Sequence, residues 1–182
     1  MKSKYLFYIF LLIFVIGCAK ETQEQENKIE QQTGVVEMKL TSPAFSHNTN
    51  IPLEYTCDGS DLSPPLAISD VPANAKSLAL IVDDPDAPVG TWDHWVVLNI
   101  PPNIKEIPKG TEPNGVAGKN SWGRTGYGGP CPPSGTHRYF FKLYALDTML
   151  NLQEGSTKKQ IESAMQGHIL AKAELIGLYQ RK

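Results

Sequence analysis

Two loops of this sequence carry most of the polar side chains that could do chemistry. The first reads DDPDAP at residues 83–88, and His94 follows it at the start of the next apolar run. Carboxylates crowded into one turn repel each other unless they hold a partner, so Asp84 and Asp86 are candidates to orient an imidazole or to meet a cation. A plain turn is the alternative interpretation, because Asp-Pro pairs are common in turns.

The second loop, GRTGYGGPCPPSGTHRY at residues 123–139, contains five glycines and three prolines. Glycine allows a backbone to approach a ligand closely, while Pro132 and Pro133 stiffen the loop. His137 and Tyr139 are two positions apart, so in a strand their side chains share one face and can donate hydrogen bonds to an anion. Taken singly, His137 could equally be a structural histidine, but the combination favours a binding site.

Short apolar runs predict the strands that position these loops. They cover residues 36–40, 78–82, 95–100 and 138–146 and are rich in Val, Ile, Leu and aromatic residues. Both faces of the last run carry large apolar side chains, which predicts a central strand. The segments between the runs are rich in Pro and Gly and lack helical periodicity. We therefore expect a mainly β, antiparallel fold rather than alternating strands and helices.

One helix is predicted near the C-terminus. Thr157 and Gln160 have the spacing of a capping box, the apolar residues within 161–165 follow a helical spacing, and Gly167 is suited to end the helix. Residues 173–180 can form another strand, or a short helix followed by a strand.

The first residues of the chain predict an export signal. Two lysines precede twelve consecutive apolar residues at 5–16, which would span about 18 Å as a helix and fall short of a bilayer core of about 30 Å. Residues 15–18, VIGC, resemble the lipobox of bacterial lipoproteins; an ordinary signal peptide with an incidental cysteine is the alternative. We therefore expect a signal peptide at 1–17 and a lipid on Cys18, which anchors the protein to the cell membrane or the outer membrane, outside the cytoplasm.

Residues 18–36 are rich in Gln and Glu and contain no aromatic residue, which predicts a disordered tether after the lipidated cysteine. The folded domain is expected to occupy residues 37–182. The whole chain has 17 Lys and Arg against 19 Asp and Glu, a formal net charge of −2, and no cluster of basic residues. We therefore expect no nucleic-acid partner, because binding to phosphates needs a concentrated positive field.

Cys57 and Cys131 remain once Cys18 is assigned to the anchor. Two cysteines in an exported protein more often form a disulfide than stay as thiols. A Cys57–Cys131 disulfide is therefore expected, provided that the two Cα atoms lie within about 7 Å of each other.

Five motifs, in order, resemble the phosphatidylethanolamine-binding protein family, also called Raf kinase inhibitor-like proteins, in its bacterial branch. They are IPLEYTCDG at 51–59, DPDAP at 84–88, HWVVLN at 94–99, GGPCPP at 128–133 and GTHRYFFKLYAL at 135–146. The resemblance covers nearly all of residues 37–181. It implies a β-sandwich of antiparallel sheets with one or two peripheral helices near the C-terminus.

The resemblance also implies a small anion pocket at one end of the sandwich. Its residues here would be Asp84, Asp86, His94, Pro132, Pro133, His137 and Tyr139. In the family this pocket takes phosphate-like or carboxylate groups, including the phosphoethanolamine head of a phospholipid. Carboxylates beside an anion would repel it, so we expect the aspartates to hold the histidines as donors or to meet an ammonium group.

We therefore predict a membrane-tethered, extracytoplasmic binding protein for a small anion or a phospholipid headgroup, without cofactor or metal and not an enzyme. Inhibition or regulation of another protein is an additional option. The alternative is a hydrolase that uses Cys131 and His137 as a thiol–imidazole pair, or a metal held by Asp84, His94 and His137. The sequence contains no H-E-x-x-H or C-x-x-C spacing in support of such a site.

Overall fold

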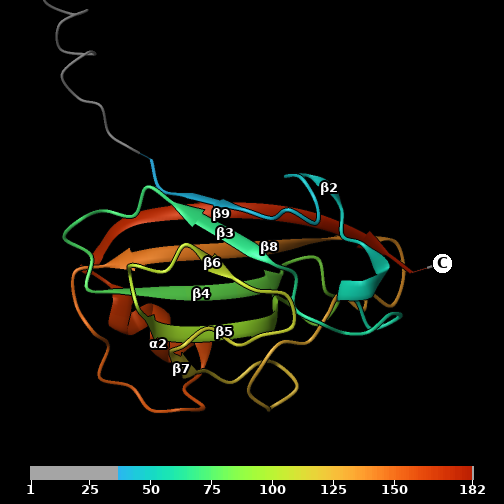
Figure 1. Cartoon of the computed structure of the whole chain (residues 1–182). Helices are drawn as coiled ribbons and strands as arrows, with labels where there is room; N and C mark the ends of the chain where they lie inside the picture. Colours follow the sequence, from blue (N-terminus) through green and yellow to red (C-terminus); the bar gives the residue numbers. More distant parts are fainter. Residues whose placement is uncertain (1–36, 182) are drawn as a thin grey trace, which may run out of the picture. The chain divides into compact units, whose positions relative to one another are not determined.

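Two β-sheets packed face to face, with a helix on the outside, form the part of the chain that the structure describes (Figure 1). This structure is a computed structural model that describes residues 37–181, so the predicted signal peptide at 1–17 and tether at 18–36 lie outside the described residues. The larger sheet has the strand order β2-β9-β8-β4-β5-β7, and the smaller has β1-β3-β6. Neighbouring strands are antiparallel except for β2 and β9.

Along the chain, three short elements are followed by six strands and then by a C-terminal helix and strand. Their bounds are β1 (Lys39–Thr41), β2 (Thr49–Asn50), the 3-10 turn η1 (Leu53–Tyr55), β3 (Leu66–Ser69), β4 (Ser77–Asp84), β5 (Trp92–Ile100), β6 (Glu106–Ile107), β7 (Val116–Ala117), β8 (Thr136–Leu146), α2 (Lys158–Met165) and β9 (Ile169–Gln180).

The main core lies between the two sheets. Alternate side chains of the central strands point into it. Leu80 of β4 and Phe141 of β8 are fully buried there against Leu40, Ile68 and Ile107 of the smaller sheet. Burying each such side chain stabilises the fold by roughly 1.5–3 kcal/mol. Every residue of β4 is buried, because this strand has neighbours on both sides and is covered on both faces.

Helix α2 covers the other face of the larger sheet. Its Ile161 and Met165 are buried in a second apolar cluster that includes Val96 of β5. The side chain of Thr157 accepts a hydrogen bond from the backbone N–H of Gln160, and the backbone N–H of Thr157 donates to the Gln160 side chain. This capping box satisfies backbone groups that the first turn leaves unpaired. None of the helices within residues 37–181 is long and apolar enough to cross a membrane.

The predicted fold class, mainly antiparallel β with a helix near the C-terminus, is confirmed. The central strand predicted at 138–146 is β8, which pairs with β9 on one side and β4 on the other. The short-helix option for residues 173–180 is wrong, because they belong to β9, whose side chains alternate between buried and partly exposed positions. The short strands β2, β3, β6 and β7 were not predicted, because two to four residues carry too little pattern.

A β-bulge in β5 sets the direction of His94. Strands β4 and β5 pair Val82 with Trp95 and Asp83 with Asp93, so His94 is an additional residue without a partner across this ladder. As a result, the consecutive residues His94 and Trp95 both face the pocket and inter-sheet side, whereas Asp93 lies on the α2 side beside a lysine of that helix. A bulge can re-aim a side chain in this way at the edge of a functional site.

Candidate functional site

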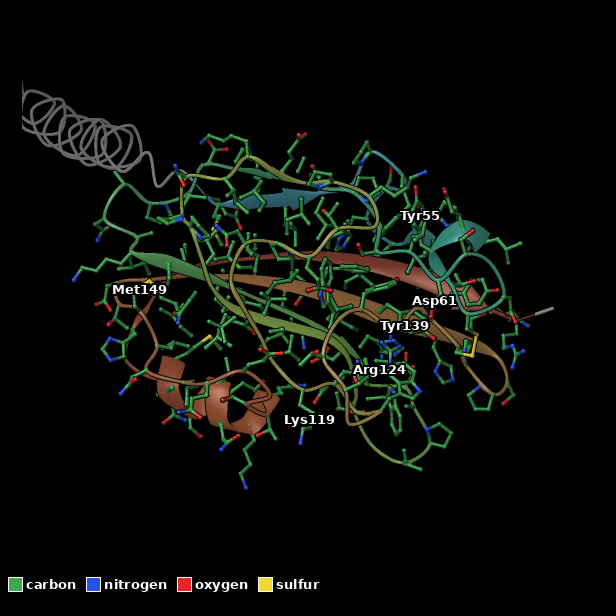
Figure 2. The ribbon with its side chains drawn as sticks, turned by 60° about the horizontal axis from the view of Figure 1, so that its bottom comes forward. Tyr55, Asp61, Lys119, Arg124, Tyr139 and Met149 are labelled. Carbon is green, nitrogen blue, oxygen red and sulfur yellow. A yellow bond between two sulfur atoms is a disulfide. The ribbon has the colours of Figure 1, made fainter. Side chains whose placement is uncertain are left out.

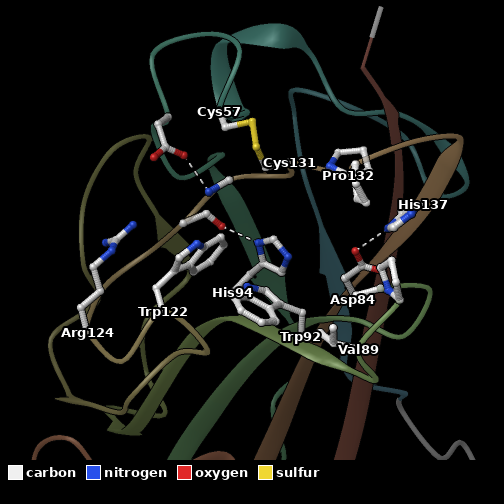
Figure 3. A pocket seen from close by; sticks show the side chains of 16 residues that line it. Cys57, Asp84, Val89, Trp92, His94, Trp122, Arg124, Cys131, Pro132 and His137 are labelled. Carbon is white, nitrogen blue, oxygen red and sulfur yellow. Dashed lines mark hydrogen bonds and ion pairs between the residues drawn. A yellow bond between two sulfur atoms is a disulfide. The ribbon is translucent and has the colours of Figure 1, made fainter.

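A pocket of about 330 Å³ lies at the end of the larger sheet where β4 ends and β5 begins (Figure 3). Its lining combines the two loops identified in the sequence with segment 57–61. Figure 2 shows Asp61, Arg124 and Tyr139 at this end of the sheet and Met149 at the other. Of the predicted residues, the lining contains Asp84, His94, Pro132, Pro133 and His137.

His94 is held in the pocket wall by both its backbone and its ring. Its backbone carbonyl oxygen accepts a hydrogen bond from the N–H of Gly128 at 3.0 Å, and its Nδ1 lies 2.7 Å from the carbonyl oxygen of Gly128. The rings of Trp122 and Tyr139 meet the imidazole edge-on, with centroids 5.0 and 5.2 Å away. Only 3% of His94 is exposed, and this burial lowers the pKa of the imidazole despite the opposing effects of the Gly128 hydrogen bond and nearby carboxylates.

Asp84 and His137 form a buried pair from two adjacent strands. The Nδ1 atom of His137 lies 2.7 Å from Oδ2 of Asp84, although 53 positions separate the two residues. The other oxygen of Asp84 accepts the backbone N–H of Asp86 at 2.8 Å. The carboxylate therefore fixes the orientation of His137, as the sequence predicts for an aspartate that holds an imidazole.

Asp86 lies outside the pocket lining, which corrects its predicted position. Its carboxylate accepts hydrogen bonds from the backbone N–H of Arg138 at 3.0 Å and from the Arg138 guanidinium at 2.9 and 2.7 Å. These hydrogen bonds lower the pKa of Asp86 to about 2. Asp84 lines the pocket, whereas the Asp86 carboxylate joins the turn after β4 to Arg138 at the start of β8.

Tyr139 also lies outside the lining, although it shares a strand face with His137 as predicted. It is buried below the pocket with its ring against His94. Burial is the main reason that the pKa of its phenol is raised, and the Asp84 carboxylate adds to the effect. Its hydroxyl is buried and has no hydrogen-bond partner among the described residues. In this conformation the Tyr139 ring packs against the His94 ring and helps to hold it in place.

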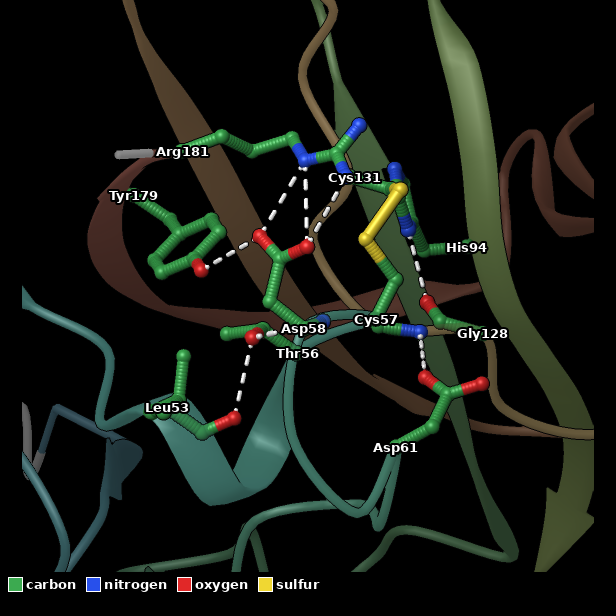
Figure 4. Close-up of a disulfide and its surroundings, with 11 residues drawn as sticks. Leu53, Thr56, Cys57, Asp58, Asp61, His94, Gly128, Cys131, Tyr179 and Arg181 are labelled. Carbon is green, nitrogen blue, oxygen red and sulfur yellow. Dashed lines mark hydrogen bonds and ion pairs between the residues drawn. A yellow bond between two sulfur atoms is a disulfide. The ribbon is translucent and has the colours of Figure 1, made fainter.

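A disulfide closes the rim of the pocket (Figure 4). It joins Cys57 to Cys131, whose Cα atoms are 5.4 Å apart, and both residues line the pocket. The backbone N–H of Cys57 also donates to the carbonyl oxygen of Pro130 at 3.1 Å. Because the Cys131 sulfur is bonded to Cys57, it is not free to act as a nucleophile with His137, which overturns the thiol–imidazole alternative.

The metal-site alternative has no geometric support in residues 37–181. No group of three or more His, Cys, Asp or Glu side chains in this part of the chain is arranged to hold a metal ion. Asp84 is instead hydrogen-bonded to His137, and His94 is bonded to a backbone carbonyl.

Sequence reasoning missed three side chains that complete the pocket. Trp122 stands edge-on to Trp92, with centroids 5.4 Å apart, and Arg124 lies 5.7 Å from the centre of the Trp122 ring. Asp61 also lines the pocket, and its Oδ1 accepts the backbone N–H of Gly129 at 2.6 Å. A tryptophan and an arginine on either side of Gly123, in a polar loop, were the available signal, since large aromatic residues are unusual in exposed loops.

Comparisons with known proteins agree with this architecture. A family model described as phosphatidylethanolamine-binding protein matches residues 41–180. The UPF0098 protein of Methanothermobacter thermautotrophicus is 55% identical, over 79% of this chain and 99% of that protein. The UPF0098 protein of Chlamydia trachomatis is 50% identical, over the same shares.

Solved structures show the same fold. A crystal structure of a Chlamydia trachomatis protein that is presented as a phosphatidylethanolamine-binding protein homologue superimposes with a TM-score of 0.79 at 49% identity, over 81% of this chain and 99% of the other. Escherichia coli YBCL, described as a new member of the mammalian family, superimposes with a TM-score of 0.75 at 33% identity, over 80% and 99%.

Proposed function

The chain belongs to the phosphatidylethanolamine-binding protein family, and from this premise we propose that it binds a small anion, such as the phosphate group of phosphoethanolamine, in the pocket around His94. Family membership supports a small-ligand-binding protein in general. The choice of an anion rests on the side chains of the pocket, and above all on His94.

The observation that carries this proposal is a buried imidazole that lines an open cavity. His94 is almost fully removed from solvent, yet it contributes to the wall of the pocket, where its ring can meet a ligand. Arg124 adds a positive charge to the same wall. Its guanidinium donates to the carbonyl oxygen of Tyr127 at 3.1 Å and forms no ion pair within residues 37–181, so it is available to an anion.

The carboxylates of the pocket support a ligand that also carries a positive charge. Asp61 accepts a backbone N–H but has no cationic side chain beside it in the described part of the chain. An ammonium group near Asp61 and a phosphate near His94 and Arg124 would satisfy both charges of phosphoethanolamine. Such complementary charges fix the orientation of a ligand as well as its affinity.

Calorimetric titration of the full-length protein with phosphoethanolamine tests this proposal. The variants His94→Ala and His137→Ala should each weaken binding by about 1.5–3 kcal/mol, the value of a hydrogen bond to a charged group. His168→Ala is the matched control, because this histidine is exposed and paired with Asp147 away from the pocket. Unchanged affinity in both pocket variants, with intact circular dichroism, would contradict the site.

The membrane tether remains a prediction from the sequence, and it is part of the proposed function. Replacing Cys18 by Ser should remove the lipid attachment site and release the protein from the membrane fraction. A Cys18→Ser protein that still partitions into membranes at its mature mass would contradict the lipoprotein interpretation. The absence of enzymatic activity and the option of a regulated protein partner also stay predictions.

A further inference from the structure

The two ring nitrogens of His94 have different surroundings, and this difference determines what the pocket can accept. Nδ1 lies 2.7 Å from the carbonyl oxygen of Gly128. A carbonyl oxygen only accepts hydrogen bonds, so Nδ1 must carry a hydrogen in either charge state of the ring. Nε2 is therefore a bare lone pair when His94 is neutral, and it becomes an N–H donor only when the ring gains a second proton.

The Nε2 atom is the part of the ring that is free to meet a ligand. It has no hydrogen-bond partner within residues 37–181, and it does not belong to the buried polar atoms without partners in that part of the chain. His94 nevertheless lines the cavity, with Trp122 beside it and the Asp84–His137 pair also in the wall (Figure 3). Nε2 therefore reaches the cavity itself.

Several charged or titratable groups surround this imidazole. They are Asp83 and Asp84 from β4, Asp93 from β5, His137 and Tyr139 from β8, and Asp61 and Arg124 from the loops of the pocket. The three carboxylates of β4 and β5 favour the protonated ring, but burial outweighs them and lowers the pKa of His94. Near neutral pH the empty pocket thus presents a lone pair, which repels the lone pairs of a fully deprotonated anion.

On the basis of the proposed anion-binding function, we propose that the pocket takes up one proton together with its anion and therefore prefers phosphomonoesters to phosphodiesters. The proton lies between Nε2 of His94 and an oxygen of the ligand. A phosphomonoester can supply it, because its second ionisation has a pKa of about 6, whereas a phosphodiester has no proton to give near neutral pH. With a phosphodiester, the imidazole itself must be protonated first.

Phosphoethanolamine and glycerophosphoethanolamine are matched probes, since both carry the ethanolamine group and differ in ester type. At about pH 7.5 we expect phosphoethanolamine to bind more tightly than glycerophosphoethanolamine, and the ratio of the two affinities should fall as the pH is lowered toward 5, because the imidazole is then increasingly protonated before the ligand binds. Titrations of the full-length protein in buffers with different heats of ionisation should show uptake of close to one proton at the higher pH.

The variant His94→Gln removes the group that would take up the proton but keeps a hydrogen-bond donor in the pocket wall. A glutamine amide can present an N–H near the position of Nε2 at any pH. This variant should therefore bind both esters with similar affinity and without proton uptake, whereas His168→Gln, at an exposed histidine, should behave like the unmodified protein. If His94→Gln fails to fold, proton uptake by the unmodified protein still decides the question.

The possible results distinguish this inference from the function on which it rests. Equal affinity of the unmodified protein for both esters at about pH 7.5, without proton uptake, would overturn the proton-linked preference and leave the anion-binding function standing. No binding of either ester at any pH would overturn both.

Discussion

Two neighbouring aspartates of strand β4 meet opposite environments on the two faces of one sheet. Asp83 faces α2, fully buried, and its carboxylate accepts hydrogen bonds from the Nζ atoms of Lys142 at 2.8 Å and Lys158 at 2.6 Å. Asp84 faces the pocket, and its carboxylate meets one imidazole and one backbone N–H. Alternation along a strand is enough to separate these two roles.

The difference lies in how the negative charge is compensated. On the α2 side, Lys158 also approaches Asp93 at 3.1 Å, so two carboxylates and two ammonium groups form a closed cluster. On the pocket side, the Asp84 carboxylate has no permanently charged partner within residues 37–181, and its imidazole partner lines a cavity. A closed cluster supports the fold, whereas an incompletely compensated carboxylate at a cavity can take part in binding a ligand.

The largest effect on stability is expected when the negative charge is removed at Asp83, and the same change at Asp84 serves as the comparison. Asp83→Asn should lower the free energy of unfolding by about 4 kcal/mol, because Lys142 and Lys158 lose their buried partner. Asp84→Asn should cost only about 1 kcal/mol, because an amide oxygen can still accept from His137, but it should weaken phosphoethanolamine binding about tenfold. Denaturant unfolding and calorimetry measure the two quantities. Similar stability losses in both variants would contradict the division of roles.

The disulfide offers a test of the pocket side alone. The double variant Cys57→Ser/Cys131→Ser should lower the free energy of unfolding by about 3 kcal/mol, since the bond closes a long loop of the unfolded chain. Amide hydrogen exchange should rise first at Gly128 and Gly129, next to the released rim, and not in α2. A uniform rise across both faces would show that the rim is not a separate unit.

The smallest effect on stability is expected at a third aspartate, Asp86, because its pairing with Arg138 is partly exposed to solvent. Its pKa is about 2 in the folded protein, against an ordinary value of 3.8, so its contribution to stability is complete above about pH 4 and is lost as the pH falls toward 2. Screening by solvent limits this contribution to about 1 kcal/mol. Arg138→Gln should remove that part of the acid dependence. If denaturant unfolding shows that the Arg138→Gln variant loses stability below about pH 4 just as the unmodified protein does, the pairing of Asp86 with Arg138 is contradicted.

Much of the fold could be predicted from the sequence, because its signals are local. Apolar runs gave β4, β5 and β8, and the spacing of Thr157 and Gln160 gave the start of α2. The shared face of His137 and Tyr139 followed from alternation in the same way. The short strands and the course of the long loops depend on distant partners, and they were not predictable.

The site was predicted less completely than the fold, for the same physical reason. The spacing of Asp84 and Asp86 cannot show that Arg138 draws the second carboxylate away from the pocket. Nor does any local pattern show that Trp122 returns from its loop to contact His94. These contacts join residues far apart in the sequence, and turn geometry decides them.

The bulge at His94 makes the proposed binding site separable from the scaffold by a single deletion. Because the β4–β5 ladder already skips this residue, loss of one codon would join Asp93 to Trp95 and should restore alternation at this point of β5. The sandwich would keep its register, and the pocket would lose its central imidazole. Deletion of one codon would thus remove the imidazole of the proposed site while the strand pairing on either side of it persists.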